Sequence, residues 1–463
     1  MTNSITVLKA GAAQVDITPA MGTQIAGDIG RRRPAELLAD PIYAKALVLE
    51  AGGRKLCVLS LDLAVVNRHW SQEIRRRISR LLGLPPENVL VHAVQNHAAP
   101  PLGHFMVSPE CTMIPDDLWW VRGGDDRYNE FAAERIVQAA ARANESLQPV
   151  KFGATSGFEP RVAENRRYVM RNGKTITHPS PWNVNMKDVL YCEGPIDPEV
   201  GVVAFTADSL KAVALLLQYT CHPVHGYPER YISAGWPGAW ARGAGELCGA
   251  QCVPMVINGC CGNIHHSHHL DKTFVDTPEN IGRLLTDDIR PLLKEIRYTG
   301  EAVLDSRTST LKLPIRTLEG GDLESARKLY REHPGPMWSD AEHTAIAWDW
   351  VYAVATLDLY EQQQRQPWAE YEVQVLRIGE IAVVALGGEP FVEAQLEIKQ
   401  QSPVRFTYFA HMSNGFVGYI PTREAFRRGG YETRTANWSM LAPESLEIIA
   451  AESVKLLKDV FAA

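Results

Sequence analysis

The chain has 463 residues and a mass of 51.4 kDa, with 47 Lys and Arg against 54 Asp and Glu, which gives a formal net charge of −7. Its 45% hydrophobic and 22% charged residues are typical of a globular protein and exclude a disordered chain, a collagen-like fibre and a coiled coil. Without a basic surplus, no nucleic-acid partner is expected.

The sequence suggests neither a membrane span nor a secretory route. The opening MTNSITVLKAGAAQVDITPAMG lacks the order of a signal peptide, and the longest apolar runs fall short of the ~18 residues of a spanning helix. Eight cysteines are too few for a disulfide scaffold, and several lie in apolar stretches. We therefore expect a soluble protein of the reducing cytoplasm with no membrane partner. The sequence leaves open whether it forms a homo-oligomer.

The first third of the chain predicts a hairpin, a helix and a buried strand. Two apolar runs over residues 43–66 are joined by a pair of glycines, as in a β-hairpin with a tight turn. Residues 69–83 have helical spacing and end at a glycine. An apolar strand over 89–94 then runs into a polar, proline-rich loop, which places Gln95 and His97 at a strand end.

The middle of the chain repeats this pattern of apolar strands that end in polar residues. An amphipathic helix is predicted over 128–147, and a hairpin over 200–224 has His222 at its exit. A short strand over 253–258 is followed by a glycine-rich turn and by four histidines between 265 and 269. Three predicted strand ends therefore offer polar side chains.

The last third predicts four helices and one hairpin. A capped helix is expected over 276–296, two helices within 318–364 and a C-terminal helix over 446–461, with a hairpin that ends just before Glu389. We find no fixed-period repeat and no flexible linker. The prediction is an α/β fold, with a mixed β-sheet core and flanking helices, that forms a single compact body and one domain over residues 1–463.

Polar residues at several strand ends are how a rigid sheet presents side chains to a shared cleft. Each has a structural alternative, because His97 and His222 could be loop or turn histidines and Glu389 could favour a helix N-terminus. Imidazole is a common metal ligand, but adjacent histidines cannot all face one ion, so at most two of the four in the run should share a site. The motifs HExxH, GxSxG, GxxxxGK[ST] and paired CxxC are absent, which disfavours zincins, α/β-hydrolases, P-loop proteins and zinc ribbons.

The strand ends belong to a series of short motifs. After the opening GAAQVDITPAMG, the motifs VQNHAAP, ENRRYV, CHPV, NGCCGNIH, GGEPF and GYIPTREAFRRGGYE follow in order. This series resembles the neutral/alkaline ceramidase family and its shorter bacterial relatives, over about residues 10 to 440. The resemblance implies that family's α/β catalytic domain, here without its immunoglobulin-like C-terminal module. It also implies a zinc ion that activates water to attack an amide.

The resemblance implies roles for individual residues as well. The family's zinc ligands correspond to His222, Glu389 and Tyr419. Its catalytic histidine, its substrate-orienting arginine and its second tyrosine correspond to His97, Arg166 and Tyr431.

Two positions depart from the family's pattern. The family's HxH reads Gln95-Asn96-His97, so Gln95, a neutral and weaker ligand, stands where the first zinc histidine is expected. The family's Gly-Asp-x-Ser turn ends here in His265, which becomes a further candidate catalytic residue. We expect a divalent metal, zinc before Mn²⁺ or Mg²⁺, bound by the three implied ligands and Gln95. The alternatives are that His97 or His265 replaces the lost ligand, that a harder ion binds, or that no metal binds.

These observations predict a bacterial, metal-dependent hydrolase of the ceramidase-like group that acts on a small soluble polar molecule rather than ceramide. The substrate would be an amide, an ester or a glycoside, and it would be polyhydroxylated or anionic. A substrate of this kind suggests a role in carbohydrate metabolism. Arg166 and Tyr431 would stabilise negative charge while His97 shuttles the proton. One alternative is a lyase or epimerase on a sugar or sugar acid, with histidine and tyrosine acid–base groups. The other is an inactive, ligand-binding homologue.

Overall fold

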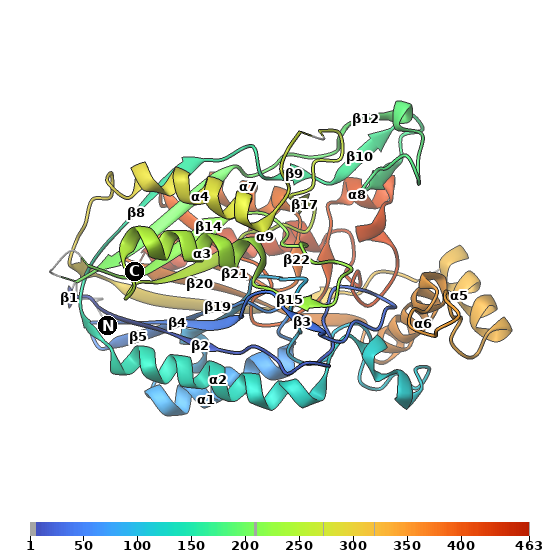
Figure 1. The fold of residues 1–463 in the computed structure, drawn as a ribbon, viewed down its shortest axis with the longest axis horizontal. Helices are drawn as coiled ribbons and strands as arrows, with labels where there is room; N and C mark the ends of the chain where they lie inside the picture. The colour runs from blue at the N-terminus through green and yellow to red at the C-terminus, as the bar shows by residue number, and fades with distance from the viewer. Residues whose placement is uncertain (1–5, 208–210, 272, 319, 463) are drawn as a thin grey trace.

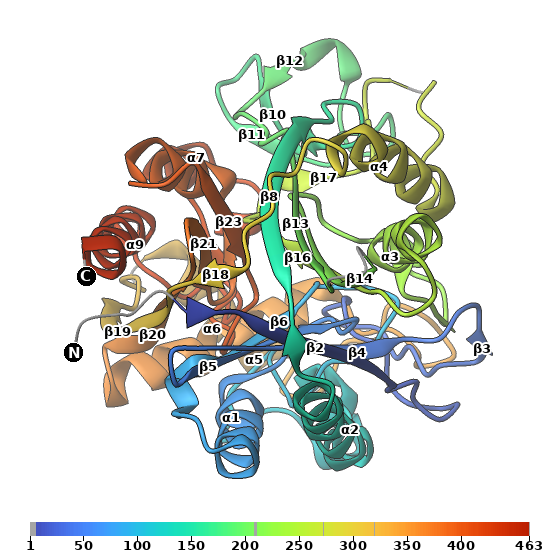
Figure 2. The same ribbon diagram turned by 90° about the vertical axis from the view of Figure 1, so that its left-hand side faces the viewer.

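The computed structural model describes residues 6–207, 211–271, 273–318 and 320–462. Three β-sheets surround a shared apolar centre, and helices cover their outer faces (Figures 1 and 2). The first sheet contains β2 (Lys9–Asp16), β4 (Tyr43–Ala51), β5 (Arg54–Leu61), β6 (Val89–Ala93) and the short β7 (Gln148–Pro149). The second contains β8 (Lys151–Phe158), β13 (Glu199–Thr206), β14 (Ala212–Tyr219) and β16 (Val253–Asn258). The third contains β19 (Leu304–Pro314), β20 (Trp368–Ile378), β21 (Ile381–Leu386) and β23 (Phe406–Ala410).

All three sheets are built in the same chain order. Three antiparallel strands are followed by a helix and by a fourth strand that lies parallel to the third. The crossover helices are α1 (Arg68–Leu82), α3 (Gly235–Cys248) and α7 (Val392–Gln401). A second helix later covers each sheet, namely α2 (Asp126–Glu145), α4 (Pro278–Leu292) and α9 (Ser445–Ala462). The fold is therefore a threefold repeat of topology.

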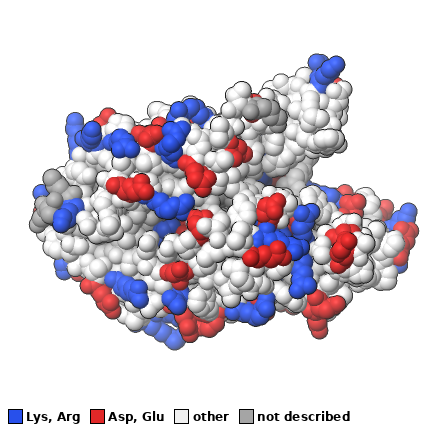
Figure 3. All heavy atoms as spheres, in the orientation of Figure 1, with Lys and Arg blue, Asp and Glu red and all other residues white. Residues whose placement is uncertain are grey.

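Insertions of different length explain why the sequence shows no fixed period. Each unit carries its insertion between its first and second strands, over residues 17–42, 159–198 and 315–367. The second holds β9 (Glu164–Asn165), β10 (Arg167–Met170), β11 (Thr175–Thr177) and β12 (Val189–Cys192), and the third holds α5 (Gly321–Glu332) and α6 (Trp348–Arg365). These two insertions project from the body in Figure 1, and the surface is hollowed between them in Figure 3. Positive and negative side chains are interspersed on that face.

The direction of the strands places all three insertions at one edge. The first strand of each unit runs antiparallel to the second, and therefore in the same direction as the third and fourth. Its insertion thus leaves from the edge at which the third and fourth strands also end. Loops at the carboxyl ends of parallel strands commonly form ligand sites in α/β folds.

The apolar centre is formed by the inner faces of the three sheets. Leu49 and Val58 of the first sheet, Val203 of the second and Leu376 and Val383 of the third are fully buried there. The sheets consequently hold one another in place and form one compact body, as predicted. The division into domains stays a prediction.

Local signals in the sequence account for the predicted elements. Asn67 caps α1 by accepting from Trp70 N, and Gly83 ends that helix at a φ of 65°. Thr277 caps α4, with Pro278 in its first turn. The predicted helices and hairpins are confirmed, with ends that differ from the predicted ones by up to five residues, apart from residues 208–210 of one hairpin turn, which lie outside the described residues.

The remaining elements are short. They are β1 (Thr6–Val7), β3 (Leu37–Leu38), β15 (Tyr231–Ile232), β17 (Ile264–His265), β18 (Glu301–Ala302), β22 (Glu389–Pro390), β24 (Tyr419–Ile420) and α8 (Arg423–Arg428), with 3-10 turns at 86–88, 116–122, 186–188 and 431–433. None of the helices in the described ranges combines the length and apolar character needed to cross a bilayer.

Candidate functional site

The carboxyl edge of the sheets opens into a cavity of about 710 Å³. All three insertions line it, the first with Asp28, the second with His178 and Asn183, and the third with Trp348. Trp348 is 49% exposed, so part of its ring reaches solvent. A cavity of this volume suits a small-molecule ligand.

The predicted site residues gather in this cavity and in a small extension of it. Those that line the main cavity are His97, Arg166, His222, His265, Tyr419 and Tyr431. The extension, of about 60 Å³, shares His97, Tyr419 and Tyr431 with the main cavity and adds Gln95 and Glu389. The structure thus brings together every residue for which the sequence analysis predicted a catalytic or metal-binding role. Their chemical roles stay predictions.

His222 and His97 meet at the inner end of the cavity. His222 follows β14, and its Nδ1 lies 3.3 Å from the carbonyl oxygen of Cys261. Because a carbonyl can only accept, Nδ1 carries the proton and Nε2 of His222 is an acceptor. That Nε2 lies 3.0 Å from Nε2 of His97. Burial lowers the pKa of His97 to about 3 and that of His222 well below its usual value, so both rings are neutral at pH 7.

Glu389 and Tyr419 are fixed beside each other by the pairing of β22 with β24. The pairing needs glycine on both strands, because a Cβ at Gly388 would lie 2.5 Å from the carbonyl oxygen of Gly418, and one at Gly418 would lie 2.2 Å from the backbone of Trp438. Oε2 of Glu389 is buried and has no hydrogen-bond partner in the described part of the chain. Burial raises the pKa of Glu389 to about 7.

Arg166 is held by a buried partner that the sequence reasoning missed. Its Nε donates to Oε1 of Glu432 at 2.8 Å, and its Nη2 donates to the carbonyl oxygen of Gly262 at 2.7 Å. The other oxygen of Glu432 accepts from Arg167 at 2.6 Å and from Thr177 at 2.9 Å. Glu432 directly follows Tyr431 in the GGYE motif, which was the only available signal. The charge of Arg166 is therefore compensated within the protein.

Gln95 lies between His411 and Glu389. His411 Nδ1 faces the carbonyl oxygens of Asn258, at 3.1 Å, and of Gly259, so Nδ1 must carry the proton and Nε2 must accept. The Gln95 side-chain atom 2.9 Å from that Nε2 is therefore assigned as the amide nitrogen, which donates to it. In this orientation of the amide, its oxygen faces the side of Glu389. Gln95 also has a positive φ of 70°, which is uncommon for a residue other than glycine.

Histidines form much of the cavity wall. Two of the predicted run of four line it, His265 and His266, together with His178 and His225, which sequence reasoning had not singled out. Burial lowers the pKa of His178 to about 3 and that of His266 to about 4, and it lowers the pKa of His265 well below its usual value. These imidazoles are neutral at pH 7. With Arg166 compensated and the carboxylates of Asp28 and Asp276 in the wall, the cavity offers no surplus of positive charge.

Only one group of described residues has three His, Cys, Asp or Glu ligand atoms within 4.8 Å of one another, as a metal site needs. It consists of His225, His266 and Asp276. His97, His222 and Glu389 do not form such a group, because at least one of their separations exceeds that distance. The described residues therefore contain a His/His/Asp group whose ligand atoms are spaced as those of a metal site, whereas His97 and the implied zinc ligands His222 and Glu389 do not meet that spacing.

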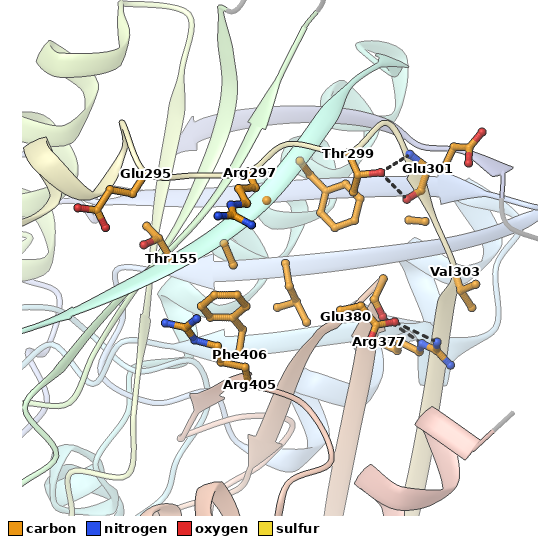
Figure 4. A pocket seen from close by; sticks show the side chains of 16 residues that line it. Thr155, Glu295, Arg297, Thr299, Glu301, Val303, Arg377, Glu380, Arg405 and Phe406 are labelled. Atoms are coloured by element: carbon orange, nitrogen blue, oxygen red, sulfur yellow. Dashed lines mark hydrogen bonds and ion pairs between the residues drawn. The ribbon is translucent and has the colours of Figure 1, made fainter.

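A second cavity, of about 720 Å³, lies at the opposite edge, where β8, β21 and β23 begin (Figure 4). Its lining is charged, with Glu295, Arg297, Glu301, Arg377, Glu380 and Arg405. All of these except Arg377 are exposed to water. Solvated charges of both signs need no ligand, and none of the predicted site residues lies there, so we do not regard this cavity as a candidate active site.

Comparison with known proteins shows the fold. No protein-family model and no curated protein matches the sequence. Among solved structures, the chain is similar to the neutral ceramidase from Pseudomonas aeruginosa, with 19% identity, a TM-score of 0.71, and coverage of 98% of this chain and 74% of that one. It is also similar to a ceramidase complexed with C2, with 17% identity, a TM-score of 0.70, and coverage of 99% and 76%. The ceramidase-like fold suggested by the motifs is confirmed.

Proposed function

We propose that the chain is a metal-assisted hydrolase of a small, soluble, polar substrate. One observation carries the proposal, namely that buried polar atoms without partners belong to residues around one small space. His97 Nδ1 and Glu389 Oε2 are both buried without a hydrogen-bond partner among the described residues, and both residues line the extension of the cavity. Burying acceptors without donors costs free energy that a bound cation would recover.

The chemistry of these donors fits a divalent ion with nitrogen and oxygen ligands, for which zinc is the first choice. His222, Glu389 and Tyr419 would hold it. His97 is the better replacement for the histidine that Gln95 lacks, because its ring centroid is 5.0 Å from that of His222, with the two Nε2 atoms 3.0 Å apart, whereas the ring centroid of His265 is 6.3 Å from that of His222. Metal binding would require Glu389 to move toward the two imidazoles. When bound, such an ion lowers the pKa of a water molecule and polarises the scissile group.

The cavity supports a neutral polyhydroxylated substrate over an anionic one. The charge of Arg166 is matched by Glu432, so Arg166 contributes hydrogen-bond donors rather than a free countercharge. Burial raises the pKa of Tyr431 well above its usual value, so its hydroxyl stays protonated and can donate to a developing oxyanion. The exposed face of Trp348 would suit a sugar ring.

Elemental analysis of the purified, untagged protein tests the metal. We expect about one zinc per chain in the wild type and none in His222→Ala, because the variant removes a proposed ligand nitrogen. His97→Ala should lower the zinc content and His265→Ala should not. Zinc retained by the folded His222→Ala variant would contradict the ligand assignment. Turnover of any substrate would exclude an inactive binding protein.

A lyase or epimerase acting on a sugar or sugar acid is the second candidate. It is favoured by the separation of Glu389 from the two histidines, and by the raised pKa of Glu389, about 7, which suits proton transfer near neutral pH. Labelled water separates the two reactions, since hydrolysis places its oxygen in the product and epimerisation does not. The second candidate would be favoured if the protein contains no stoichiometric metal and its product contains no oxygen from the labelled water.

We further propose a cytoplasmic location, which rests on eight free cysteines. Small-molecule substrates remain the only partners that we propose.

A further inference from the structure

His225 lies in the cavity wall, three residues after His222. Its side chain is 9% exposed, and its Nε2 lies 3.0 Å from Oδ1 of Asp276. A carboxylate oxygen can only accept, so Nε2 carries the proton in this bond. The other ring nitrogen, Nδ1, is buried and has no hydrogen-bond partner among the residues that the structure describes. In its neutral form, the ring therefore holds an unused lone pair at the wall of the cavity.

Asp276 is fixed by three donors. Its Oδ1 also accepts from Nδ1 of His266 at 2.6 Å, and its Oδ2 accepts from the hydroxyl of Ser267 at 2.8 Å. Nε2 of His266 in turn accepts from the backbone N–H of Val224 at 3.3 Å. His266 is thus protonated on Nδ1, the less common form of a neutral histidine. Burial opposes ionisation of Asp276, but the bonds from the two histidines outweigh it and hold its pKa below the usual range.

The arrangement suits a proton better than a metal ion. The rings of His225 and His266 are stacked, with centroids 3.7 Å apart and planes 8° apart. The lone pair of an imidazole nitrogen lies in the plane of its ring, and two parallel planes at this distance share no point where an ion could sit. His266 Nδ1 also already carries the proton that it donates to Asp276. The short distances among the three residues are accounted for by hydrogen bonds.

We propose that His225, oriented by Asp276, is an acid–base residue of this cavity. Its Nδ1 takes a proton from a water molecule or from a substrate hydroxyl while the oxygen of that group attacks. Nε2–H stays hydrogen-bonded to Asp276 during this step. The resulting imidazolium is stabilised by the carboxylate and by the face of the neutral His266 ring. The same proton then passes from Nδ1 to the leaving oxygen, so the residue returns to its starting state.

The inference deepens the proposed function, on which it rests. If His97 serves as a metal ligand, the reaction needs another group for the proton, and His225 is at the other end of a row of imidazoles. Successive ring centroids from His97 through His222, His265 and His266 to His225 are 5.0, 6.3, 4.4 and 3.7 Å apart. Both ends of the row line the same cavity.

Nitrogen NMR of protein labelled with ¹⁵N-histidine tests the arrangement without a substrate. His225→Gln assigns the signals of that ring by their loss. We expect His225 to be protonated on Nε2, His266 on Nδ1, and neither to change when zinc is added. A neutral His225 protonated on Nδ1, or zinc-bound signals from either ring, would overturn the proposal.

Hydrolysis of p-nitrophenyl acetate, a small activated ester, tests the role. We expect His225→Gln to lower kcat about 100-fold at unchanged zinc content, and Asp276→Asn to lower it about tenfold. The matched control is His268→Gln. His268 lies in the loop that carries His266 and Asp276 but contacts Val162 and Phe274, so the variant should change kcat less than about twofold. Wild-type kcat in His225→Gln, or zinc lost from it, would refute the proposal. A wild type that leaves the ester intact would count against the proposed hydrolase, and the NMR result would still decide the state of His225.

Discussion

The two large cavities of this protein have nearly the same volume, about 710 and 720 Å³, and lie at opposite ends of the same strands. The one at the carboxyl edge is lined by buried histidines, a compensated arginine and acceptors without donors. The one at the amino edge has six charged residues in its lining, and all of them except Arg377 are exposed to water, which can solvate them (Figure 4). The candidate site is therefore distinguished by buried polar atoms without hydrogen-bond partners, whose burial costs free energy, and not by the volume of its cavity.

The largest expected difference between the two edges is in the free energy of unfolding that is lost when one carboxylate is removed at each of them. Glu432 is fully buried between Arg166 and Arg167, so Glu432→Ala leaves both guanidinium groups without their carboxylate. We expect a loss of about 3–5 kcal/mol in the free energy of unfolding, measured by urea denaturation. The same change at the other cavity, Glu380→Ala, removes a side chain that is 81% exposed and should cost less than about 0.5 kcal/mol. Equal losses would remove the distinction between the edges.

Stability should depend on pH through Glu389. In the metal-free protein its pKa is about 7 against an ordinary value of 4.5, so the folded state binds more protons than the unfolded state between these values. The free energy of unfolding contributed by this group therefore falls as pH rises from about 4.5 to 7, by roughly 3 kcal/mol in total. Glu389→Gln should be stabilised relative to wild type at pH 8 but not at pH 4, in urea denaturation with a chelator present. Parallel profiles for the two proteins would contradict the buried, unpartnered carboxyl.

Two glycines with the same φ separate the effect of close packing at the site from the effect of backbone strain. Gly418 and Gly173 both have a φ of 76°, but a Cβ at Gly418 would lie 2.2 Å from the backbone of Trp438, whereas one at Gly173 has nothing within 4 Å. Gly173→Ala should cost about 1 kcal/mol from backbone strain alone. Gly418→Ala should cost more, about 2–3 kcal/mol, because the pairing of β22 with β24 must shift. Melting temperatures of both variants measure the difference.

Substitution of Gln95 has the smallest expected effect, and it tests metal binding most directly through the affinity for zinc. Gln95→His restores the ligand type of the resembled family beside Glu389, so zinc affinity should rise at least about tenfold in competition with a chelator. Gln95→Leu supplies no ligand atom and is the matched control. If the histidine variant binds zinc no better than wild type, the side chain at this position does not reach the ion.

Much of the site could be predicted because it is built from strand ends. Apolar runs identify β6, β14 and β21, and the polar residue beyond each run, such as His97, His222 or Glu389, is then placed at one edge by strand direction. The motif series supplied Arg166 and both tyrosines, which lie outside these strands. Element type and order were therefore available from local pattern and resemblance.

The rest depends on contacts between distant residues. Glu432 pairs with an arginine 266 positions away, and Asp276 meets His225 across 51 positions, with no local pattern to relate them. The threefold repeat was hidden because its insertions differ in length. The orientation of the Gln95 amide follows only from the carbonyl groups around His411.

The common position of the insertions has a consequence for how this protein can change. Each insertion is anchored at both ends to neighbouring strands of its own sheet, and each supplies a different wall of the cavity. A change in length or composition within residues 159–198 would thus remodel the wall that holds His178 and Asn183, while Asp28 and Trp348 keep their places. Ligand preference can be altered one wall at a time, on a scaffold whose apolar centre takes no part in the exchange.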